Sequence, residues 1–285
     1  MKVLPFKIPK PEASTLFLQE DKVRSFYGIL HQHTETQLSF IVKGQGKLIV
    51  SNSVHSYAEN DIFVIGSNTP HLFQSAKSHE NSHMITLFIS ADRFISDFKR
   101  IPELEELSSF FSECGNGVKV TSHANEIIEL IFQMRNSNRF ATFLFFLQLV
   151  QKINSADKRK LSSYLPTKKI TNLEGRRLQL VFDYAVNNFE KEITLDQIAG
   201  ILPMTTPSFC RFFKQRTNKT FFEFLIELRI AHACELLLQH EKKSIAEISE
   251  ASGFHSISNF NRSFKKLKKV SPSQFARTIE QTMGF

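Results

Sequence analysis

The spacing of apolar residues divides the chain into a front part with strand character and a rear part with helix character. Up to residue 90, short apolar runs alternate with turn-forming residues, which is typical of an antiparallel sandwich or barrel. Beyond residue 90, apolar residues recur every three or four positions, which predicts amphipathic helices. We therefore expect an α+β multidomain protein in which an antiparallel β-barrel and some helices precede an all-α domain. The predicted strands are residues 38–42, 47–50, 61–65 and 84–89.

The predicted helices after the strands are residues 91–111, 125–134 and 139–153. The last of these has apolar side chains on two faces, one with Phe140 and Leu144 and another with Phe145 and Leu149. One face is expected to pack on the sheets. The other face fits a partner chain or further core of the same subunit equally well.

A polar and basic stretch, residues 156–174, predicts a linker between a first domain of residues 1–155 and a second of residues 175–285. A length of 285 residues also favours two domains. The hydrophobic content of 41% and the 29 phenylalanines supply packed cores for both.

Near the end of the chain, two short helices flank a turn. Ser244 and Glu247 have the spacing of a capping box, which marks a helix start, and Gly253 suits the left-handed residue that ends this helix. A second helix from about residue 256 places Phe260 and Phe264 on one stripe, and Arg262 points away from it. No carboxylate occurs between residues 251 and 279, so the outward face is cationic. The segment predicts a helix-turn-helix, although a solvated basic helix has the same pattern.

The same pattern occurs about 50 residues earlier. Thr194 and Gln197 form a matching capping box, and past the turn Phe209, Arg211 and Phe213 match positions 51 residues later. Two further boxes, Thr220 with Glu223 and Ser271 with Gln274, start the exit helices. The repeat predicts two helix-turn-helix units joined by a long helix from about residue 221 to residue 240.

These residues resemble the C-terminal DNA-binding domain of AraC/XylS-type transcription regulators over roughly residues 173–280. The matching positions of the second copy are Gly253-Phe254, Phe260-x-Arg262-x-Phe264-Lys265-Lys266 and Ser271-Pro272-x-x-Phe275. The family usually has Gly before the Ser-Pro pair, where this chain has Val270, and Arg directly after the aromatic, where it has Ala276. Asn218 takes the Gly position in the first copy and tolerates a left-handed backbone. Val270 is β-branched and resists positive φ, so we expect a reshaped turn there.

The resemblance implies that two helices, about residues 205–217 and 256–268, enter successive major-groove segments of double-stranded DNA. The residues expected to read base edges are Thr206, Cys210, Arg211, Ile257, Asn261 and Arg262, with Ser258 beside them. The residues expected to bind phosphates are Lys214, Lys265, Lys266 and Lys269. An ion pair with a carboxylate of the same protein is as good an interpretation of Arg211 or Arg262 as contact with a base.

Charge and cysteine content fit this interpretation without proving it. A net charge of +8 and a pI near 9.3 suit a polyanionic partner, but the excess is shared evenly, at +4 for residues 1–170 and +4 for residues 171–285. Three scattered cysteines, Cys114, Cys210 and Cys234, indicate free thiols in a reducing compartment. The sequence has neither a signal peptide nor an apolar run long enough to span a membrane, which predicts a cytoplasmic protein. The sequence contains no phosphate-binding loop, no nucleophile elbow and no zinc-protease helix.

The front part resembles a cupin barrel, the usual N-terminal domain of one branch of the same family. His31-Gln-His33, Gln37 and Gly44 follow the first cupin motif, and residues 60–71, which end in His71, follow the second. Cupin enzymes hold a metal with two histidines, a carboxylate and a third histidine, which map here to His31, His33, Gln37 and His71. Because the neutral amide of Gln37 is a poorer metal ligand than a carboxylate, we expect neither a metal nor a cofactor.

A half-apolar ligand pocket is the expected use of the barrel. The side chains expected to point inward are Phe40, Val42, Phe63 and Phe73, with His31, His33 and His71 as polar contacts. The same residues fit an ordinary barrel core nearly as well.

Together these patterns predict a sequence-specific DNA-binding transcription regulator that is not an enzyme and is controlled by a small-molecule effector in its cupin-like domain. Some regulators of this family dimerise through helices after the cupin domain, and the resemblance therefore implies a homodimer. RNA polymerase is a further partner if the protein is an activator. Two alternatives remain. One is a constitutive regulator with a ligand-free cupin used for dimerisation, and the other is a metal-dependent cupin enzyme fused to a DNA-binding domain.

Overall fold

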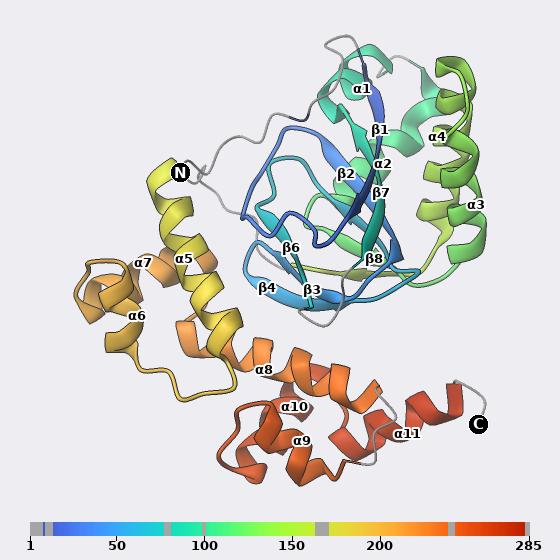
Figure 1. Ribbon diagram of the computed structural model, residues 1–285. Helices are drawn as coiled ribbons and strands as arrows, with labels where there is room; N and C mark the ends of the chain where they lie inside the picture. Colours follow the sequence, from blue (N-terminus) through green and yellow to red (C-terminus); the bar gives the residue numbers. More distant parts are fainter. Residues whose placement is uncertain are drawn as a thin grey trace. The chain divides into compact units, whose positions relative to one another are not determined.

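The computed structural model describes residues 8, 14–76, 81–98, 101–162, 171–238 and 243–282. The chain forms two compact units, residues 1–51 with 57–175 and residues 52–56 with 176–285. In Figure 1 the first unit extends from blue to yellow-green and the second from yellow to red. None of the described helices is both long and apolar enough to cross a membrane.

The strands build two sheets. A six-stranded antiparallel sheet has the order β1-β7-β2-β5-β8-β9, and a three-stranded sheet has the order β4-β3-β6. Their bounds are β1 Leu16–Val23, β2 Thr36–Lys43, β3 Gly46–Val50, β4 Ser53–Tyr57, β5 Ile62–Ile65, β6 His71–Ser75, β7 Ser82–Ile89, β8 Val118–Val120 and β9 Lys158–Lys160. An isolated bridge between His31 and His71 joins the loop before β2 to β6.

The fold class is as predicted, except that the described strands do not close into a barrel. Among the described strands, β3 pairs with β4 and β6, and the ladders do not run on into the six-stranded sheet. The two sheets instead face one another as a sandwich, with Leu48, Phe63 and Phe73 in the core between them.

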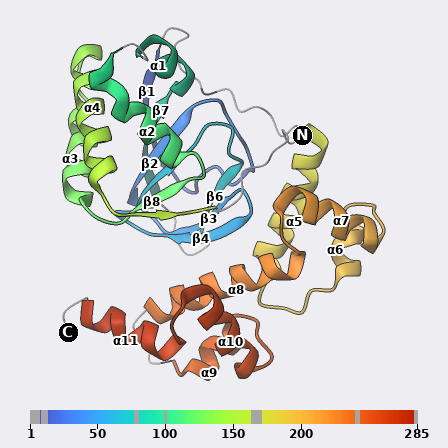
Figure 2. The same cartoon turned by 180° about the vertical axis from the view of Figure 1, so that it is seen from behind.

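Helices cover the other face of the six-stranded sheet, as Figure 2 shows from behind. They are α1 Ala91–Phe98, a 3₁₀ turn Pro102–Leu104, α2 Glu105–Cys114, α3 Ala124–Met134 and α4 Arg139–Ser155. Leu38, Phe40 and Val64 of the sheet share one core with Phe146 and Ile153 of α4. Because the central strands are buried on both faces, β5 is a continuous apolar run and β2 contains the largely apolar stretch from Leu38 to Val42, which is why the sequence predicted them.

The sequence pattern did not predict several of the strands. β1 is only partly buried, and β8 and β9 have three residues each, so their pattern is weak. The segment Lys158–Lys160 had been placed in the linker because it is entirely basic, but it pairs with β8 at the sheet edge and Leu161 beyond it is buried. Lysine and arginine suit an edge strand because they discourage pairing with other chains. Most of the remaining linker, residues 163–170, lies outside the described residues.

The second unit is helical and closely follows the predicted repeat. Its helices are α5 Asn172–Asn188, α6 Leu195–Ile201, α7 Thr206–Thr217, α8 Phe221–Leu238, α9 Ile245–Ala251, α10 Ile257–Lys268 and α11 Pro272–Thr282. All four predicted capping boxes are present as reciprocal hydrogen bonds. Thr171 and Glu174 form one more at α5, which sequence analysis missed.

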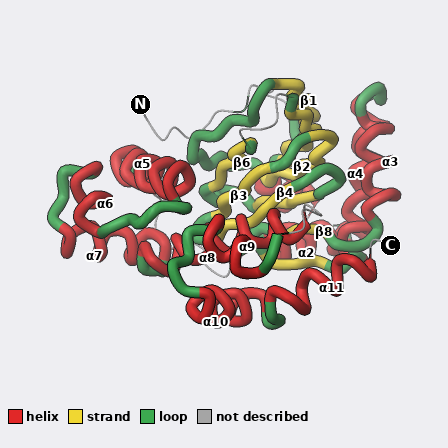
Figure 3. Tube along the Cα trace, turned by 60° about the horizontal axis from the view of Figure 1, so that its bottom comes forward, coloured by secondary structure: helices red, strands yellow, loops and turns green. Residues whose placement is uncertain are grey.

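The long helix α8 contributes to two cores. Phe221 and Phe224 near its start pack with Phe182 and Phe213, whereas Ile230 and other residues further along pack with α9 and α10. In Figure 3, α5, α6 and α7 gather toward one end of this unit and α9, α10 and α11 toward the other. Each helix-turn-helix is thus fixed to a different part of one rigid helix.

Candidate functional site

The two candidate recognition helices, α7 and α10, are held by the same arrangement of aromatic side chains. Phe209 and Phe213 of α7 are fully buried, as are Phe260 and Phe264 of α10, and each pair is in ring contact. Because a helix turns about 100° per residue, anchoring these positions exposes the residues between them. Both helices therefore present their opposite face outward.

In α7 three of the four predicted DNA-binding residues are exposed. Cys210, Arg211 and Lys214 lie on the surface. Thr206 is half-buried, and its hydroxyl donates to Asp196 of α6 at 2.5 Å. The Thr206 hydroxyl thus stabilises the turn between the two helices, which makes this residue a weaker candidate for reading a base.

In α10 all seven predicted residues are exposed: Ile257, Ser258, Asn261, Arg262, Lys265, Lys266 and, at the end of the helix, Lys269. The guanidinium of Arg262 donates from Nη2 to Oδ1 of Asn259, one turn earlier, at 3.1 Å. Asn259 is exposed on the same outward face and was missed by sequence analysis. The sequence did carry a signal for this contact, because an asparagine three residues before an arginine lies on the same face of a helix.

The left-handed residue after α10 is Lys269 at φ 66°, where a reshaped turn at Val270 had been predicted. Lys269 is the position that matches Asn218, which has φ 54° after α7, so the two copies share one C-terminal cap. The prediction for Val270 was wrong by one position, because the repeat offset of 51 residues places the matching site at Lys269.

Gly253 sits where the two helix-turn-helix units meet. Its φ is +80°, and a Cβ at this position would lie 2.5 Å from the carbonyl oxygen of Phe189. Beside it, Arg229 of α8 donates to the carbonyl oxygens of Phe189 and Lys191, each at 2.8 Å. The loop between α5 and α6 is therefore held against the turn between α9 and α10.

A cavity of about 340 Å³ opens in the first unit between β1, β7 and the loop before β2. Its lining residues are Gln19, Asp21, Val23, Ser25, Phe26, Tyr27, His31, Gln37, Phe73, Met84, Thr86 and Phe88. Of the predicted ligand contacts, His31 and Phe73 line this cavity. Phe40 does not, because it points to the opposite face of β2 and packs against Phe132 of α3. Val42 points the same way, whereas Phe63 is fully buried between the sheets.

The three cupin-motif histidines come together, as their mapping implied. The ring of His31 lies 4.3 Å from that of His71 and 5.9 Å from that of His33, measured between centroids. Burial lowers the pKa of His31 to about 4 and that of His71 well below its ordinary value. Nitrogen atoms of the three rings lie within 4.8 Å of one another, so this is a group that could hold a metal ion.

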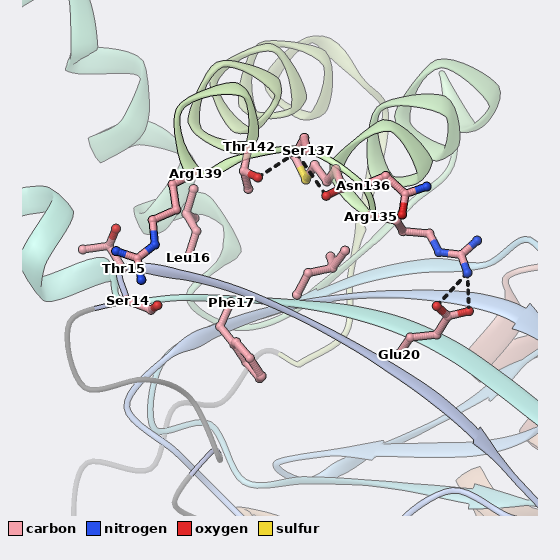
Figure 4. A pocket seen from close by; sticks show the side chains of 12 residues that line it. Ser14, Thr15, Leu16, Phe17, Glu20, Arg135, Asn136, Ser137, Arg139 and Thr142 are labelled. Carbon is pink, nitrogen blue, oxygen red and sulfur yellow. Dashed lines mark hydrogen bonds and ion pairs between the residues drawn. The ribbon is translucent and has the colours of Figure 1, made fainter.

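A second hollow, of about 460 Å³, lies between β1 and the turn from α3 to α4, where sequence analysis had placed no site. As Figure 4 shows, Arg135 makes a two-point ion pair with Glu20, at 2.7 and 2.9 Å. Ser137 and Thr142 bond to one another at 2.8 Å. With Arg135 already paired with Glu20, this hollow does not resemble a prepared ligand site.

Comparison with known proteins agrees with the two-unit architecture. The model of an AraC-like ligand-binding domain matches residues 16–150, and the model of a helix-turn-helix domain matches residues 198–278. The chain belongs to the AraC family of transcription regulators. Members of this family bind DNA through the second domain and carry a ligand-binding domain in front of it, and the chain is a DNA-binding regulator of this type.

Individual AraC-family relatives are distant. An uncharacterized HTH-type transcriptional regulator of Bacillus subtilis, YdeC, is 20% identical over 254 residues, which cover 87% of this chain and 86% of the relative. The transcriptional activator RhaS of Mannheimia succiniciproducens is 22% identical, with 86% of this chain and 87% of the relative covered. Among solved structures, ToxT of Vibrio cholerae is 20% identical with a TM-score of 0.37, covering 93% of this chain and 98% of ToxT.

Proposed function

We propose that this regulator places α7 and α10 in successive major-groove segments on one face of its operator. The observation that carries this proposal is the pair of exposed, cationic helix faces, each anchored by two buried phenylalanines. No acidic residue occurs from Ala251 to Ile279, so α10 presents its lysines to phosphate without internal neutralisation.

The exposed residues divide into two roles. Residues in the first turns of each helix are the candidates for base edges: Cys210, Arg211, Ile257, Ser258, Asn261 and Arg262. Lys214, Lys265, Lys266 and Lys269 follow toward the helix ends and are the candidates for phosphates. Hydrogen bonds from Thr220 lower the pKa of Glu223, and Lys266 and Lys214 lower it further. Lys214 of α7 and Lys266 of α10 therefore both lie within electrostatic reach of Glu223 at the start of α8.

The effector is proposed to bind in the 340 Å³ cavity of the first unit. The cavity combines aromatic walls, such as Phe73 and Phe88, with polar groups from Asp21 and Thr86. Oε1 of Gln19 is buried and accepts no hydrogen bond from the described residues. A ligand with an apolar body and an N–H or O–H group would satisfy that oxygen. This open space favours effector control over the constitutive alternative.

A homodimer in the cytoplasm is the proposed working form, with a regulatory and not a catalytic role. Phe140 and Leu144, one turn apart on α4, are 72% and 43% exposed, and Phe132 on the preceding helix α3 is 40% exposed. Large exposed apolar side chains favour burial against a second copy. If the protein activates transcription, RNA polymerase is a further partner.

The decisive experiment is selection of genomic DNA fragments by the purified full-length protein, followed by sequencing. The proposal expects a two-part site whose segments are about one helical turn apart, near 35 Å. Binding without sequence preference, and with steep loss in salt, would show that the basic helices contact only phosphates.

Cys210 offers an independent test of which face meets DNA. It is exposed on α7, whereas Cys114 and Cys234 are buried, and burial raises the pKa of the Cys114 thiol to about 12. A maleimide should therefore label Cys210 first, and operator DNA should protect it. A thiol introduced by Ser109→Cys on α2 of the first unit provides the matched unprotected control. Equal labelling of Cys210 with and without operator would contradict the proposed interface.

A further inference from the structure

The wall of the cavity in the first unit carries a carboxylate, that of Asp21, and no cationic partner for it. Of the described residues that line the cavity, Asp21 is the acidic one, and none is a lysine or an arginine. Asp21 faces the cavity because it lies two residues from Gln19 and two from Val23 on β1, and alternate residues of a strand share one face. A chain with a net charge of +8 thus keeps a half-buried carboxylate at this wall.

The carboxylate of the preceding residue, Glu20, is ion-paired on the opposite face of β1. Arg135 donates to it at 2.7 and 2.9 Å, as Figure 4 shows. His83 lies 2.7 Å and Lys22 3.2 Å from the same carboxylate. Asp21, in contrast, forms no ion pair with any residue that the structure describes. The cations around this strand therefore pair with the outer carboxylate, and the inner carboxylate keeps an uncompensated charge.

The amide of Gln19 adds a second acceptor beside Asp21. Its Nε2 donates to both carboxylate oxygens of Asp21, at 2.9 Å each. Because the reversed amide would bring its oxygen against the carboxylate, this contact determines which amide atom is the nitrogen. Oε1 of Gln19 is then left as an acceptor, and it is buried without a hydrogen bond from the described residues. Both groups at this wall require a hydrogen-bond donor.

Aromatic side chains form much of the remaining wall. Phe26, Tyr27, Phe73 and Phe88 all line the cavity, and the rings of Phe26 and Phe73 meet edge to face at 6.3 Å between centroids. The face of an aromatic ring attracts a cation because of the ring quadrupole. An apolar body that carries a positive charge therefore matches these walls. A ligand carboxylate or phosphate would instead meet Asp21 with no lysine or arginine of the wall to neutralise it.

We propose that the effector is a small organic ammonium ion, a protonated primary or secondary amine on an aryl or alkyl body. Its N–H groups donate to the carboxylate of Asp21 and to Oε1 of Gln19, and its body packs against Phe73 and Phe88. The cavity volume of about 340 Å³ is near the lower end of the range for ligand pockets, roughly 300–1,000 Å³, so the ligand is small. This inference rests on the proposed function, which places an effector in this cavity, and it narrows that effector to one charge class.

The test compares four compounds of similar size that share one phenyl ring. They are 2-phenylethylammonium, its trimethylammonium analogue, the neutral 2-phenylethanol and the anionic 3-phenylpropanoate. Each is titrated into full-length protein with ¹³C-labelled methionine methyl groups. Met84 lines the cavity, so its methyl signal reports binding there, and Met84→Leu assigns that signal. Met134, which packs in the core on the other face of the sheet, provides the signal that should not move.

We expect 2-phenylethylammonium to bind about tenfold or more tightly than 2-phenylethanol, because charge-assisted hydrogen bonds are the stronger ones. The anion should bind most weakly. The trimethylammonium compound should bind less tightly than the primary amine, since it has no N–H group to donate, and equal binding would overturn the hydrogen bonds to Asp21 and Gln19. If the alcohol or the anion binds more tightly than the ammonium ion, the charge class is wrong and the cavity remains an effector site. If none of the four shifts the Met84 signal, the proposed effector site falls as well.

Three variants assign the preference to its residue. Asp21→Asn removes the charge with little change of shape, and it should weaken binding of 2-phenylethylammonium by about tenfold or more while binding of 2-phenylethanol is kept. Asp21→Glu retains the charge and should retain the preference for the cation. Glu20→Gln, the adjacent carboxylate on the opposite face of β1, is the matched control and should leave all four affinities unchanged. An undiminished preference for the ammonium ion in Asp21→Asn would overturn the role of Asp21.

Discussion

Arg262 leaves α10 on the side opposite Phe260 and Phe264, and its guanidinium is already oriented there by Asn259. An arginine that is held in place loses less side-chain entropy when it binds a base. We expect Arg262→Ala to weaken binding to the operator by about 1–3 kcal/mol and to relax specificity at one position. Fluorescence anisotropy with operator and random duplexes measures both effects.

Asn259 should act through Arg262. Asn259→Ala is expected to weaken operator binding less than Arg262→Ala, and the double variant should resemble Arg262→Ala alone, because contacting residues are not additive. Lys191→Ala, an exposed cation outside both recognition helices, provides the control. An equal loss on operator and random DNA in Arg262→Ala would assign the arginine to phosphate.

Two glycines of the second unit are expected to respond oppositely to the same substitution. Gly253 has φ +80° and would place a Cβ 2.5 Å from the carbonyl oxygen of Phe189, whereas Gly200 lies in α6 with nothing within 4 Å of its Cβ position. Gly253→Ala should therefore destabilise the domain by about 1–3 kcal/mol. Gly200→Ala should stabilise it by up to about 1 kcal/mol, since alanine favours helix. Urea denaturation of both variants tests the difference, and equal shifts would contradict the strained turn.

At the scale of elements, α8 determines the geometry between the two motifs, and Arg229 fixes the joint. Its two hydrogen bonds to Phe189 and Lys191, at 2.8 Å each, join α8 to the loop between α5 and α6, and its guanidinium lies 5.8 Å from the ring of Phe254. We expect Arg229→Ala to lower the free energy of unfolding by about 2–3 kcal/mol. It should also weaken binding to the two-part site more than binding to either segment alone.

Chemical denaturation and anisotropy on full and half operators measure these two consequences. Arg176→Ala, at an exposed position of α5, is the matched control and should change neither. If Arg229→Ala lowers stability but affects full and half sites equally, Arg229 supports the fold without setting the spacing of the motifs.

Elements were predictable from sequence where their signals are local. The helices from α6 to α11 each combine a period of apolar residues with a cap, as at Ser244 and Thr194, and both signals lie close together in the sequence. β9 has no such signal, because Lys158–Lys160 becomes a strand only when β8 lies beside it. The register of β2 was equally hidden: a period of two separates its faces but does not say which face meets the helices, so Phe40 was assigned to the wrong side.

In the candidate site, too, the features that depend on neighbouring residues in the sequence were predictable, and those that depend on contacts between distant segments were not. Helix geometry predicted which residues of α7 and α10 face outward, because the buried phenylalanines fix the other face, whereas the resemblance to AraC/XylS-type regulators assigned those residues to DNA. The hydrogen bond of Thr206 to Asp196 joins two helices, and Nδ1 of His71 lies 2.8 Å from the carbonyl oxygen of Thr69, on backbone whose path no side-chain pattern encodes. Those features became visible only in three dimensions.

For the whole molecule, control by an effector requires that binding in the first unit changes how the second unit meets DNA, and a second copy of the chain offers one route. Tethering two DNA-binding units through a dimeric first unit converts the second binding event into an intramolecular one. The apolar side chains that would form the interface are Phe140 and Leu144, one turn apart on α4, with Phe132 on α3.

The double substitution Phe140→Asp with Leu144→Asp should therefore give a monomer, because burying two carboxylates in an apolar interface is unfavourable. Light scattering coupled to size exclusion measures the mass, and anisotropy compares one operator with two operators in tandem. We expect the wild type to bind tandem operators more than about 100-fold more tightly than a single one, and the variant to lose that gain while its affinity for a single operator is kept. Ser109→Asp, on the exposed side of α2, should behave as wild type. If the double variant remains dimeric, the dimer interface does not involve α4. If the wild type is a monomer and its DNA binding still responds to an effector, the response takes place within one chain.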